Sequence, residues 1–211
     1  MILIEKIEVG GFEAAIRGMR NPMNSWAQSD SIWSDIDGKY HVGLNDLELM
    51  RKLVNAGTDH SKFMRMISVS MDITAPLYWW KEASTYKVGT VANSCSTMHK
   101  LTAKPFEIDD FSHDKMHDST MNALEIVVNY LNYARDMYLT AEDEYKKSYW
   151  WQMIQLLPSS YNQKRTVFLN YQVLRNMYHA RKNHKLDEWR KFCECVEALP
   201  YSELITMEKE R

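Results

Sequence analysis

The feature that most constrains the fold is a stretch of strict alternation between apolar and polar residues from Ile67 to Thr74. The apolar positions are Ile67, Val69, Met71 and Ile73, and the polar positions between them are Ser68, Ser70, Asp72 and Thr74. Successive side chains of a strand point to opposite faces, so the pattern predicts a β-strand with one face buried and the other wet. A second strand is predicted from Ile2 to Val9, ended by Gly10-Gly11.

Helical spacing of apolar residues dominates the rest of the chain. We expect helices at residues 12–19, 46–56, 77–81, 114–140, 141–157 and 163–182, and a last one from 183 or 184 onward. Asn45 is the expected N-cap of the second helix and Gly57 its stop, while Pro76 suits the first turn of the third. Residues 21–42 and 86–93 are expected to be loop or irregular. With its strands in the first half and a mostly helical second half, the chain belongs to the α+β class.

Composition narrows the class of function. The 211 residues contain no repeat and no linker, so we expect one domain over residues 1–211. The 26 Lys+Arg against 28 Asp+Glu argue against a protein that coats nucleic acid or a membrane surface. There is no signal-peptide pattern and no apolar run long enough to span a bilayer. Three sparse cysteines are typical of reduced thiols, so the expected location is cytoplasmic.

Several reactive or aromatic pairs have simpler interpretations than a site. Cys193 and Cys195 lack a second Cys/His pair nearby, so two ordinary thiols are favoured and no metal site is expected. Cys95 and His99 could share a helix face, but a nucleophile and its base need an orienting third group, and none is marked. The tryptophan pairs at residues 79–80 and 150–151 are interpreted as subunit-interface anchors.

Polar residues stand out in the apolar segment from residue 170 to residue 189. Asn170, Leu174, Met177 and Arg181 fall on one face at helical spacing. A buried guanidinium on that face would need an anionic or carbonyl partner. Alternatively, Arg181 reaches solvent at the helix end, where its charge suits the helix dipole. The residues alone leave both interpretations open.

Two segments together resemble the flavin-dependent thymidylate synthases in order and spacing. In the first, His60 precedes Phe63 and the alternating strand, which leads to Ala75-Pro76 and a helix. The family signature then reads Arg-His-Arg, two residues, Ser, one residue, Asn-Glu, one residue, Ser, one residue, Arg. With one inserted residue it falls on Thr85, Tyr86, Lys87, Thr90, Asn93, Ser94, Ser96 and Met98.

The second segment is the more specific part of the resemblance. It begins at Leu157-Pro158, and the family's Asn, second Asn, Arg and His fall on Asn170, Asn176, Arg181 and His184, with one residue deleted before the His. The two segments cover residues 60–98 and 157–197, a little over a third of the chain.

The resemblance implies a central antiparallel sheet flanked by helices, and a homotetramer with sites at subunit junctions. It implies FAD as cofactor, NADPH as reductant, methylenetetrahydrofolate as carbon donor and dUMP or a related pyrimidine nucleotide as the methylated substrate. By resemblance, the flavin would be held by His60, Lys87, Asn93, Asn170, Asn176 and His184. The substrate would be bound by Glu82, Ser94, Ser96 and Arg181, of which Ser96 and Arg181 would be catalytic.

Several positions depart from the family pattern. Thr85, Met98 and Ile154 replace arginines that could fork onto a phosphate, and Ser94 replaces a carboxylate. Glu82 is acidic where the family has a neutral amide. Compensating cations, if they converge, would be Lys62, Arg65, Lys81, Lys87 and Lys100. The sequence therefore supports a divergent flavin-dependent thymidylate synthase, or a catalytically degenerate homologue that binds or sequesters a nucleotide-like ligand; a structural oligomer without a ligand is the third alternative.

Overall fold

The computed structural model describes residues 1–98 and 100–208. His99, half of the Cys95–His99 pair, lies outside these residues. The chain folds into two compact units, each assembled from three separate segments of sequence. Unit 1 comprises Met1–Leu3, Ile73–Thr85 and Asn93–Arg165, and unit 2 comprises Ile4–Asp72, Tyr86–Ala92 and Thr166–Arg211. The single domain expected over residues 1–211 stays a prediction.

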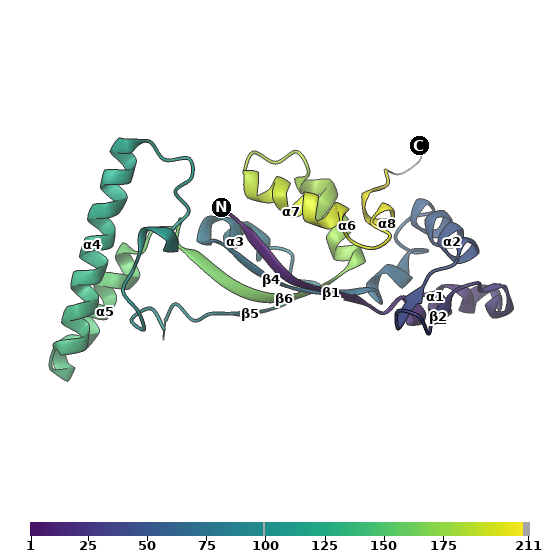
Figure 1. Ribbon diagram of the computed structural model, residues 1–211, viewed down its shortest axis with the longest axis horizontal. Helices are drawn as coiled ribbons and strands as arrows, with labels where there is room; N and C mark the ends of the chain where they lie inside the picture. Colours follow the sequence, from purple (N-terminus) through teal and green to yellow (C-terminus); the bar gives the residue numbers. More distant parts are fainter. Residues whose placement is uncertain (99, 209–211) are drawn as a thin grey trace. The chain divides into compact units, whose positions relative to one another are not determined.

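Four strands form one sheet with the order β1-β4-β6-β5 (Figure 1). Their bounds are β1 Leu3–Gly10, β4 Ser68–Pro76, β5 Val91–Ser94 and β6 Asn162–Asn170. Tyr171 N donates to Ile67 O, and Leu77 N donates to Tyr161 O, each at 3.0 Å. Residue numbers thus rise along β4 as they fall along β6, so these strands are antiparallel. The expected antiparallel sheet flanked by helices is confirmed.

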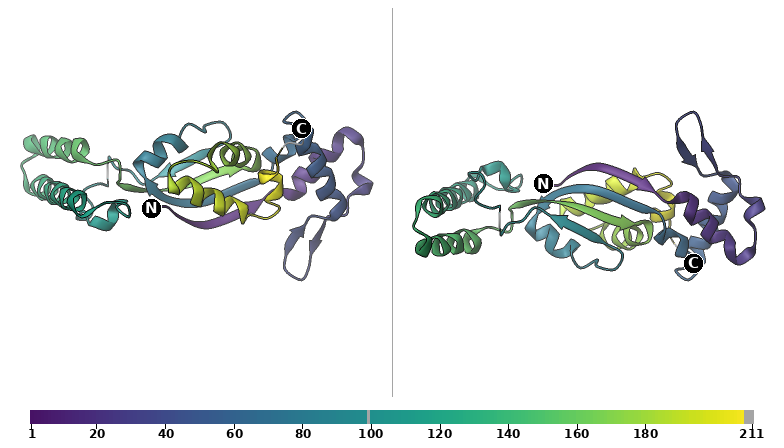
Figure 2. Two further views of the ribbon diagram at one scale, coloured as in Figure 1. Left: turned by 90° about the horizontal axis from the view of Figure 1, so that it is seen from above. Right: turned by 90° about the horizontal axis from the view of Figure 1, so that it is seen from below.

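Helices make up most of the remaining regular structure. Their bounds are α1 Phe12–Arg20, α2 Leu44–Asn55, α3 Leu77–Ala83, α4 Asp118–Thr140, α5 Asp143–Leu156, α6 Tyr171–Arg181, α7 Asp187–Glu197 and α8 Glu203–Thr206. Short 3-10 turns occupy η1 Asn21–Met23, η2 Trp26–Gln28, η3 Lys62–Arg65 and η4 Ile108–Asp110. Within unit 2, α6, α7 and α8 lie together over one face of the sheet (Figures 1 and 2). Among the described residues, no helix is long and apolar enough to cross a membrane.

The alternating strand is confirmed as β4. Val69 and Met71 are buried on the helix-covered face, whereas Ser68 and Ser70 are half-buried on the other. In unit 2, α6 lies over this face, and its Leu174 is fully buried (Figure 1). Unit 1 has a second core inside the α4–α5 hairpin, which buries Leu131 and Met153.

The helix predicted over residues 163–182 is wrong in its first half. Residues up to Asn170 form β6, and only Tyr171–Arg181 is helical, as α6. Val167 and Leu169 are buried while Phe168 is exposed, which is the period of a strand. The second half of the chain is therefore less helical than expected.

Three further expectations are corrected. Residues 32–41, expected as loop, contain a hairpin of β2 Ile32–Ser34 and β3 Lys39–His41, in which Trp33 pairs with Tyr40. Part of the segment expected to be irregular forms β5. Asn45 is not the N-cap of α2, because that helix begins at Leu44, two residues earlier than expected, and its N-cap is Gly43.

Candidate functional site

In unit 2, the loop of residues 86–90 runs alongside α6. At the C-terminal end of the helix, Arg181 Nε donates to Tyr86 Oη at 3.0 Å. Toward its N-terminal end, Gly89 has φ +76°, and a Cβ atom there would lie 2.9 Å from Asn170 Nδ2 and 3.3 Å from Val173 Cγ2. Only glycine fits this close approach in this backbone conformation. The loop is thus held against both ends of a helix about 16 Å long.

Asn170 is the N-cap of α6, and its Oδ1 accepts from Val173 N at 3.0 Å. It does not lie on a helix face with Leu174, Met177 and Arg181, because the residues before it are strand. The cap fixes the amide so that its nitrogen faces Gly89. The predicted flavin ligand therefore sits at the junction of β6, α6 and the loop.

Arg181 is half-buried among aromatic rings. Its guanidinium lies 4.9 Å from the ring centroid of Trp189 and 5.7 Å from that of Tyr86. His184 Nδ1 accepts from Leu186 N at 3.2 Å, which leaves the proton of a neutral imidazole on Nε2. The ring of His184 meets Trp189 edge-on at 6.3 Å. Arg181 and His184 are thus brought together around Trp189, in a partly enclosed setting rather than in open solvent.

Gln172, on the side of α6 away from Arg181, links the neighbour of His60 to Asn176. Ser61, next to the exposed His60, donates through Oγ to Gln172 Oε1 at 3.4 Å. Gln172 Nε2 in turn donates to Asn176 Oδ1 at 3.1 Å. Asn176 is exposed and, five residues before Arg181, faces away from it. Lys87 is exposed in the loop of residues 86–90.

The remaining predicted residues belong to unit 1. Asn93 and Ser94 are exposed at the end of β5, Ser96 is half-buried just beyond it, and Glu82 is half-buried on α3. The structure thus divides the predicted residues between the two units.

The three positions that lost a family arginine have local partners of their own. Thr85 Oγ1 donates to Glu82 O at 2.7 Å, just beyond the C-cap of α3. Met98 is exposed, and its carbonyl accepts from Trp150 Nε1 at 3.2 Å. Ile154 packs against the apolar core of the α4–α5 hairpin. None of the three can contribute a charge to an anion.

Three residues that contact a candidate-site side chain or form a second cation site were not predicted from the sequence. Tyr86 and Trp189 form the aromatic setting of Arg181. Arg165 in unit 1 lies over the Trp80 ring, with its guanidinium carbon 4.3 Å from the centroid. If residues 162–170 had been recognised as a strand, the period of two would have placed Arg165 on the same face as the buried Gln163 and Val167.

The cysteines and the tryptophan pairs differ in how far they are buried. Burial, helped by Glu197 and Glu194, raises the pKa of Cys193 to about 11, so its thiol stays protonated at neutral pH. Trp79 and Trp80 are buried inside the chain, so the subunit-interface interpretation is wrong for that pair. It stays a prediction for Trp150-Trp151, which are partly exposed. Within residues 1–98 and 100–208, no group of three His, Cys, Asp or Glu side chains could hold a metal ion.

Several solved structures have a fold similar to that of this chain. The chain superposes on the flavin-dependent thymidylate synthase ThyX from Helicobacter pylori, complexed with FAD and dUMP, with a TM-score of 0.68, 18% identity and coverage of 96% of this chain and 97% of that one. Another structure of ThyX from that organism, with FAD and dUMP, gives a TM-score of 0.67 at 17% identity, covering 98% of each chain. The UMP/dUMP methylase PolB from Streptomyces cacaoi, bound with 5-Br dUMP, gives 0.61 at 12% identity, covering 99% of this chain and 96% of that one.

The chain therefore has the fold of the flavin-dependent thymidylate synthases, as its sequence resemblance predicted. No protein-family profile matches the sequence. No curated protein matches it in sequence either.

Proposed function

We propose that the chain is a divergent flavin-dependent nucleotide methyltransferase that binds FAD and methylates dUMP or a related pyrimidine nucleotide. Methylenetetrahydrofolate would be the carbon donor and NADPH the reductant. The observation that carries the proposal is the arrangement around α6. Of the residues taken from the sequence resemblance, Asn170 lies against Gly89 and Arg181 is hydrogen-bonded to Tyr86 in the loop of residues 86–90, while His184 lies beside Trp189.

The residues around α6 are suited in kind to a flavin. Asn170 and Asn176 offer amide groups, His184 offers an imidazole N–H, and Lys87 offers an exposed cation for a pyrophosphate. When bound, the flavin supplies the hydride that such a reaction consumes. His60 and Asn93 complete the proposed ligand set.

For the substrate we keep the roles that the resemblance implies, with Arg181 and Ser96 as catalytic residues and Glu82 and Ser94 as further contacts. The aromatic faces of Tyr86 and Trp189 and the hydroxyl of Tyr86 restrict how the Arg181 guanidinium can point. A planar guanidinium held in one orientation presents its N–H groups at a fixed angle to a carbonyl or phosphate oxygen. That preorganisation is the contribution we assign to Arg181.

A second function is favoured by the lost arginines: a homologue that binds or sequesters a nucleotide-like ligand without catalysis. Ile154 packs against the apolar core of the α4–α5 hairpin, and the Thr85 hydroxyl donates to Glu82 O. A site without these guanidinium groups would hold a monophosphate more weakly unless another cation replaces them.

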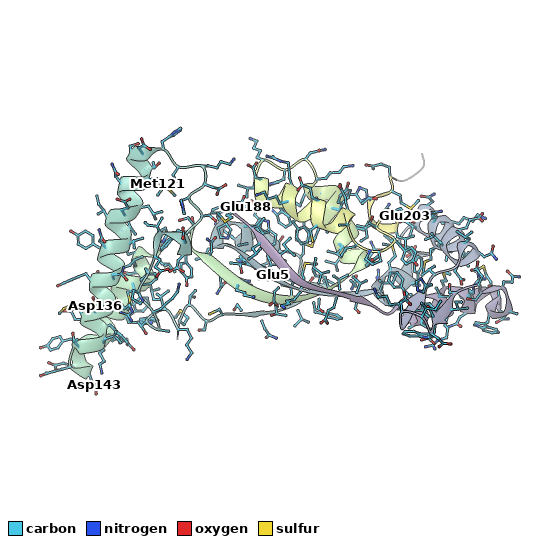
Figure 3. The ribbon with its side chains drawn as sticks, viewed as in Figure 1. Glu5, Met121, Asp136, Asp143, Glu188 and Glu203 are labelled. Carbon is cyan, nitrogen blue, oxygen red and sulfur yellow. The ribbon has the colours of Figure 1, made fainter. Side chains whose placement is uncertain are left out.

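The homotetramer expected from the resemblance belongs to the same proposal. On α4, whose course is marked by Met121 and Asp136 in Figure 3, Ile126, Tyr130 and Tyr133 are 56%, 62% and 60% exposed. At this spacing they form one stripe, on a different side of the helix from the buried Leu131. An exposed apolar stripe of this kind is typical of a surface that another chain covers.

Catalysis is tested by tritium release from dUMP labelled at C5, with FAD, NADPH and methylenetetrahydrofolate present. Release that is lost in Arg181→Ala would support the methyltransferase. Flavin and dUMP binding without release would instead support the sequestering homologue.

A further inference from the structure

Arg165 is a half-buried cation whose immediate partners are neutral. Its Nε donates to Gln163 Oε1 at 3.0 Å, and its Nη1 donates to Ser84 Oγ at 3.2 Å. The guanidinium lies over Trp80, with its carbon 4.3 Å from the ring centroid. Burial lowers the pKa of Arg165 from its ordinary value, although the group remains charged at neutral pH.

Three other enclosed arginines of this chain have anionic or carbonyl partners. Arg20 is paired with Asp46 at 2.6 Å, and Arg135 with Asp136 at 3.0 Å. Arg175 donates to two backbone carbonyls, those of Leu204 and Ile205. Among the described residues, no carboxylate lies within ion-pair distance of Arg165. A cation that is partly withdrawn from water without a counter-charge is suited to an anion that arrives from outside.

The sheet places a predicted substrate residue directly beside this cation. Cys95 N donates to Lys164 O at 3.0 Å, so Ser94 lies opposite Arg165 in the antiparallel β5–β6 pair. Directly opposite side chains share a face of the sheet. The guanidinium therefore has the hydroxyl of Ser84, the C-cap of α3, at hydrogen-bond distance, and Ser94 of β5 shares its face of the sheet.

The surroundings hold Arg165 in place. Gln163 Nε2 donates to Cys95 O at 2.7 Å, and Trp80 Nε1 donates to Gln163 O at 2.9 Å. Both the amide that accepts from Arg165 and the ring beneath it are thus fixed by further hydrogen bonds. A guanidinium preorganised in this way loses little conformational entropy when it meets an anion.

We propose that Arg165, Ser84 and Ser94 form an anion subsite in unit 1 that takes a phosphate monoester. The subsite rests on the proposed function in one respect, that the phosphate belongs to a pyrimidine nucleotide. In the family pattern, arginines stand at the positions of Thr85, Met98 and Ile154. Arg165 on β6 would provide a guanidinium in their place. A charged donor to a phosphate is worth about 1.5–3 kcal/mol, which corresponds to roughly 10–100-fold in affinity.

The test is isothermal calorimetry of the full chain with dUMP, deoxyuridine and inorganic phosphate, in the presence of FAD. Arg165→Gln is expected to weaken dUMP binding roughly 10–100-fold. The affinity for deoxyuridine should stay unchanged, because only the contact with the phosphate is removed. Arg165→Lys, which keeps the charge and can still stack on Trp80, is expected to lose less. The matched control is Arg135→Gln, which removes a half-buried arginine of the same unit that already has a carboxylate partner.

The outcomes separate the subsite from the proposed function. If Arg165→Gln folds, as judged by an unchanged circular dichroism spectrum, and binds dUMP and inorganic phosphate as tightly as the unmodified chain, the subsite is overturned. If the unmodified chain binds inorganic phosphate through Arg165 but neither dUMP nor deoxyuridine, the subsite stands and the nucleotide function fails. Equal losses for dUMP and deoxyuridine would also overturn the subsite, since they would show that Arg165 does not act on the phosphate.

Discussion

At the scale of the single residue, the buried carboxylate of Asp46 fixes a loop that has little regular structure. Asp46 is 0% exposed and accepts from Arg20 Nε, Ser29 Oγ and Ser31 Oγ, each at 2.6 Å. Burial alone would raise its pKa, but the hydrogen bonds from the two serines and Arg20 outweigh burial and lower it. Asp46 thereby joins the loop before β2 to α1 and α2.

Replacing Asp46 with Asn should destabilise the chain by about 3–5 kcal/mol at pH 7, because Arg20 would be left as an unpaired buried charge. The folded pKa is depressed, so the stabilisation is present above the unfolded value of 3.8 and is lost as the pH falls through the folded pKa. Urea unfolding at a series of pH values would check this. Glu48→Gln, in the exposed Glu48–Lys52 pair, is the control and should change little. Equal unfolding free energies for the two variants at pH 7 would contradict the account.

Gly89 is the residue on which the geometry of the candidate site depends. Gly89→Ala would place a methyl group 2.9 Å from Asn170 Nδ2 at a positive φ, so we expect a loss of about 1–3 kcal/mol in stability or a displaced loop. The matched control is Gly38→Ala, at φ +65° with nothing within 4 Å of the new methyl. Thermal unfolding and flavin retention of both variants would be measured. A Gly89→Ala protein that matches Gly38→Ala in both would show that the close approach is unimportant.

At the scale of the element, β4 could be predicted from sequence and β6 could not, for a physical reason. In β4 apolar and polar residues alternate from Ser68 to Ala75, whereas β6 carries Phe168 on its exposed side and Arg165 on its inner side. These two residues interrupt the alternation of apolar and polar residues in β6. The sequence therefore predicted that the helix α6 begins earlier, at residue 163. The consequence reached the site, because Asn170 became a helix-face residue in the prediction when it is the N-cap.

The start of α2 shows the same limit and provides a test. Asp30 Oδ2 accepts from Asn45 N at 2.9 Å and Oδ1 accepts from Asp46 N at 3.1 Å, so a carboxylate distant in sequence caps the helix. Asp30→Ala should cost about 1 kcal/mol, and Asn45→Ala, at the position that the sequence suggested, should cost less than about 0.5 kcal/mol. Chemical denaturation of both variants would decide. A larger loss for Asn45→Ala would contradict this assignment of the cap.

At the scale of the whole molecule, the fold followed from the sequence resemblance more readily than the site did. The resemblance covered a little over a third of the chain, yet the match to solved structures extends over nearly all of it. Asn170, Arg181 and His184 could be picked out by residue type and spacing. The two rings beside Arg181 belong to Tyr86 and Trp189, which match no residue of a sequence motif. Such partners depend on tertiary packing, which spacing along one chain cannot show.

Assembly is a prediction at this scale. Replacing Tyr130 and Tyr133 with Lys should reduce the sedimentation mass of the protein, because charges would be placed on the exposed stripe of α4. Tyr145→Lys, at a 55% exposed aromatic residue on α5, is the control. An unmodified chain that sediments as a monomer at every concentration would contradict the proposed homotetramer.

The most direct test of the central claim is the absorbance spectrum, from the near-ultraviolet to the blue, of the purified protein after incubation with excess FAD and gel filtration. We predict a flavin spectrum that co-elutes with the unmodified chain and is strongly reduced in a His184→Ala, Asn176→Ala double variant, while Arg135→Gln retains it. A chain that remains colourless with excess FAD, or a double variant that retains the flavin in full, would contradict the assignment of the flavin site to the residues around α6.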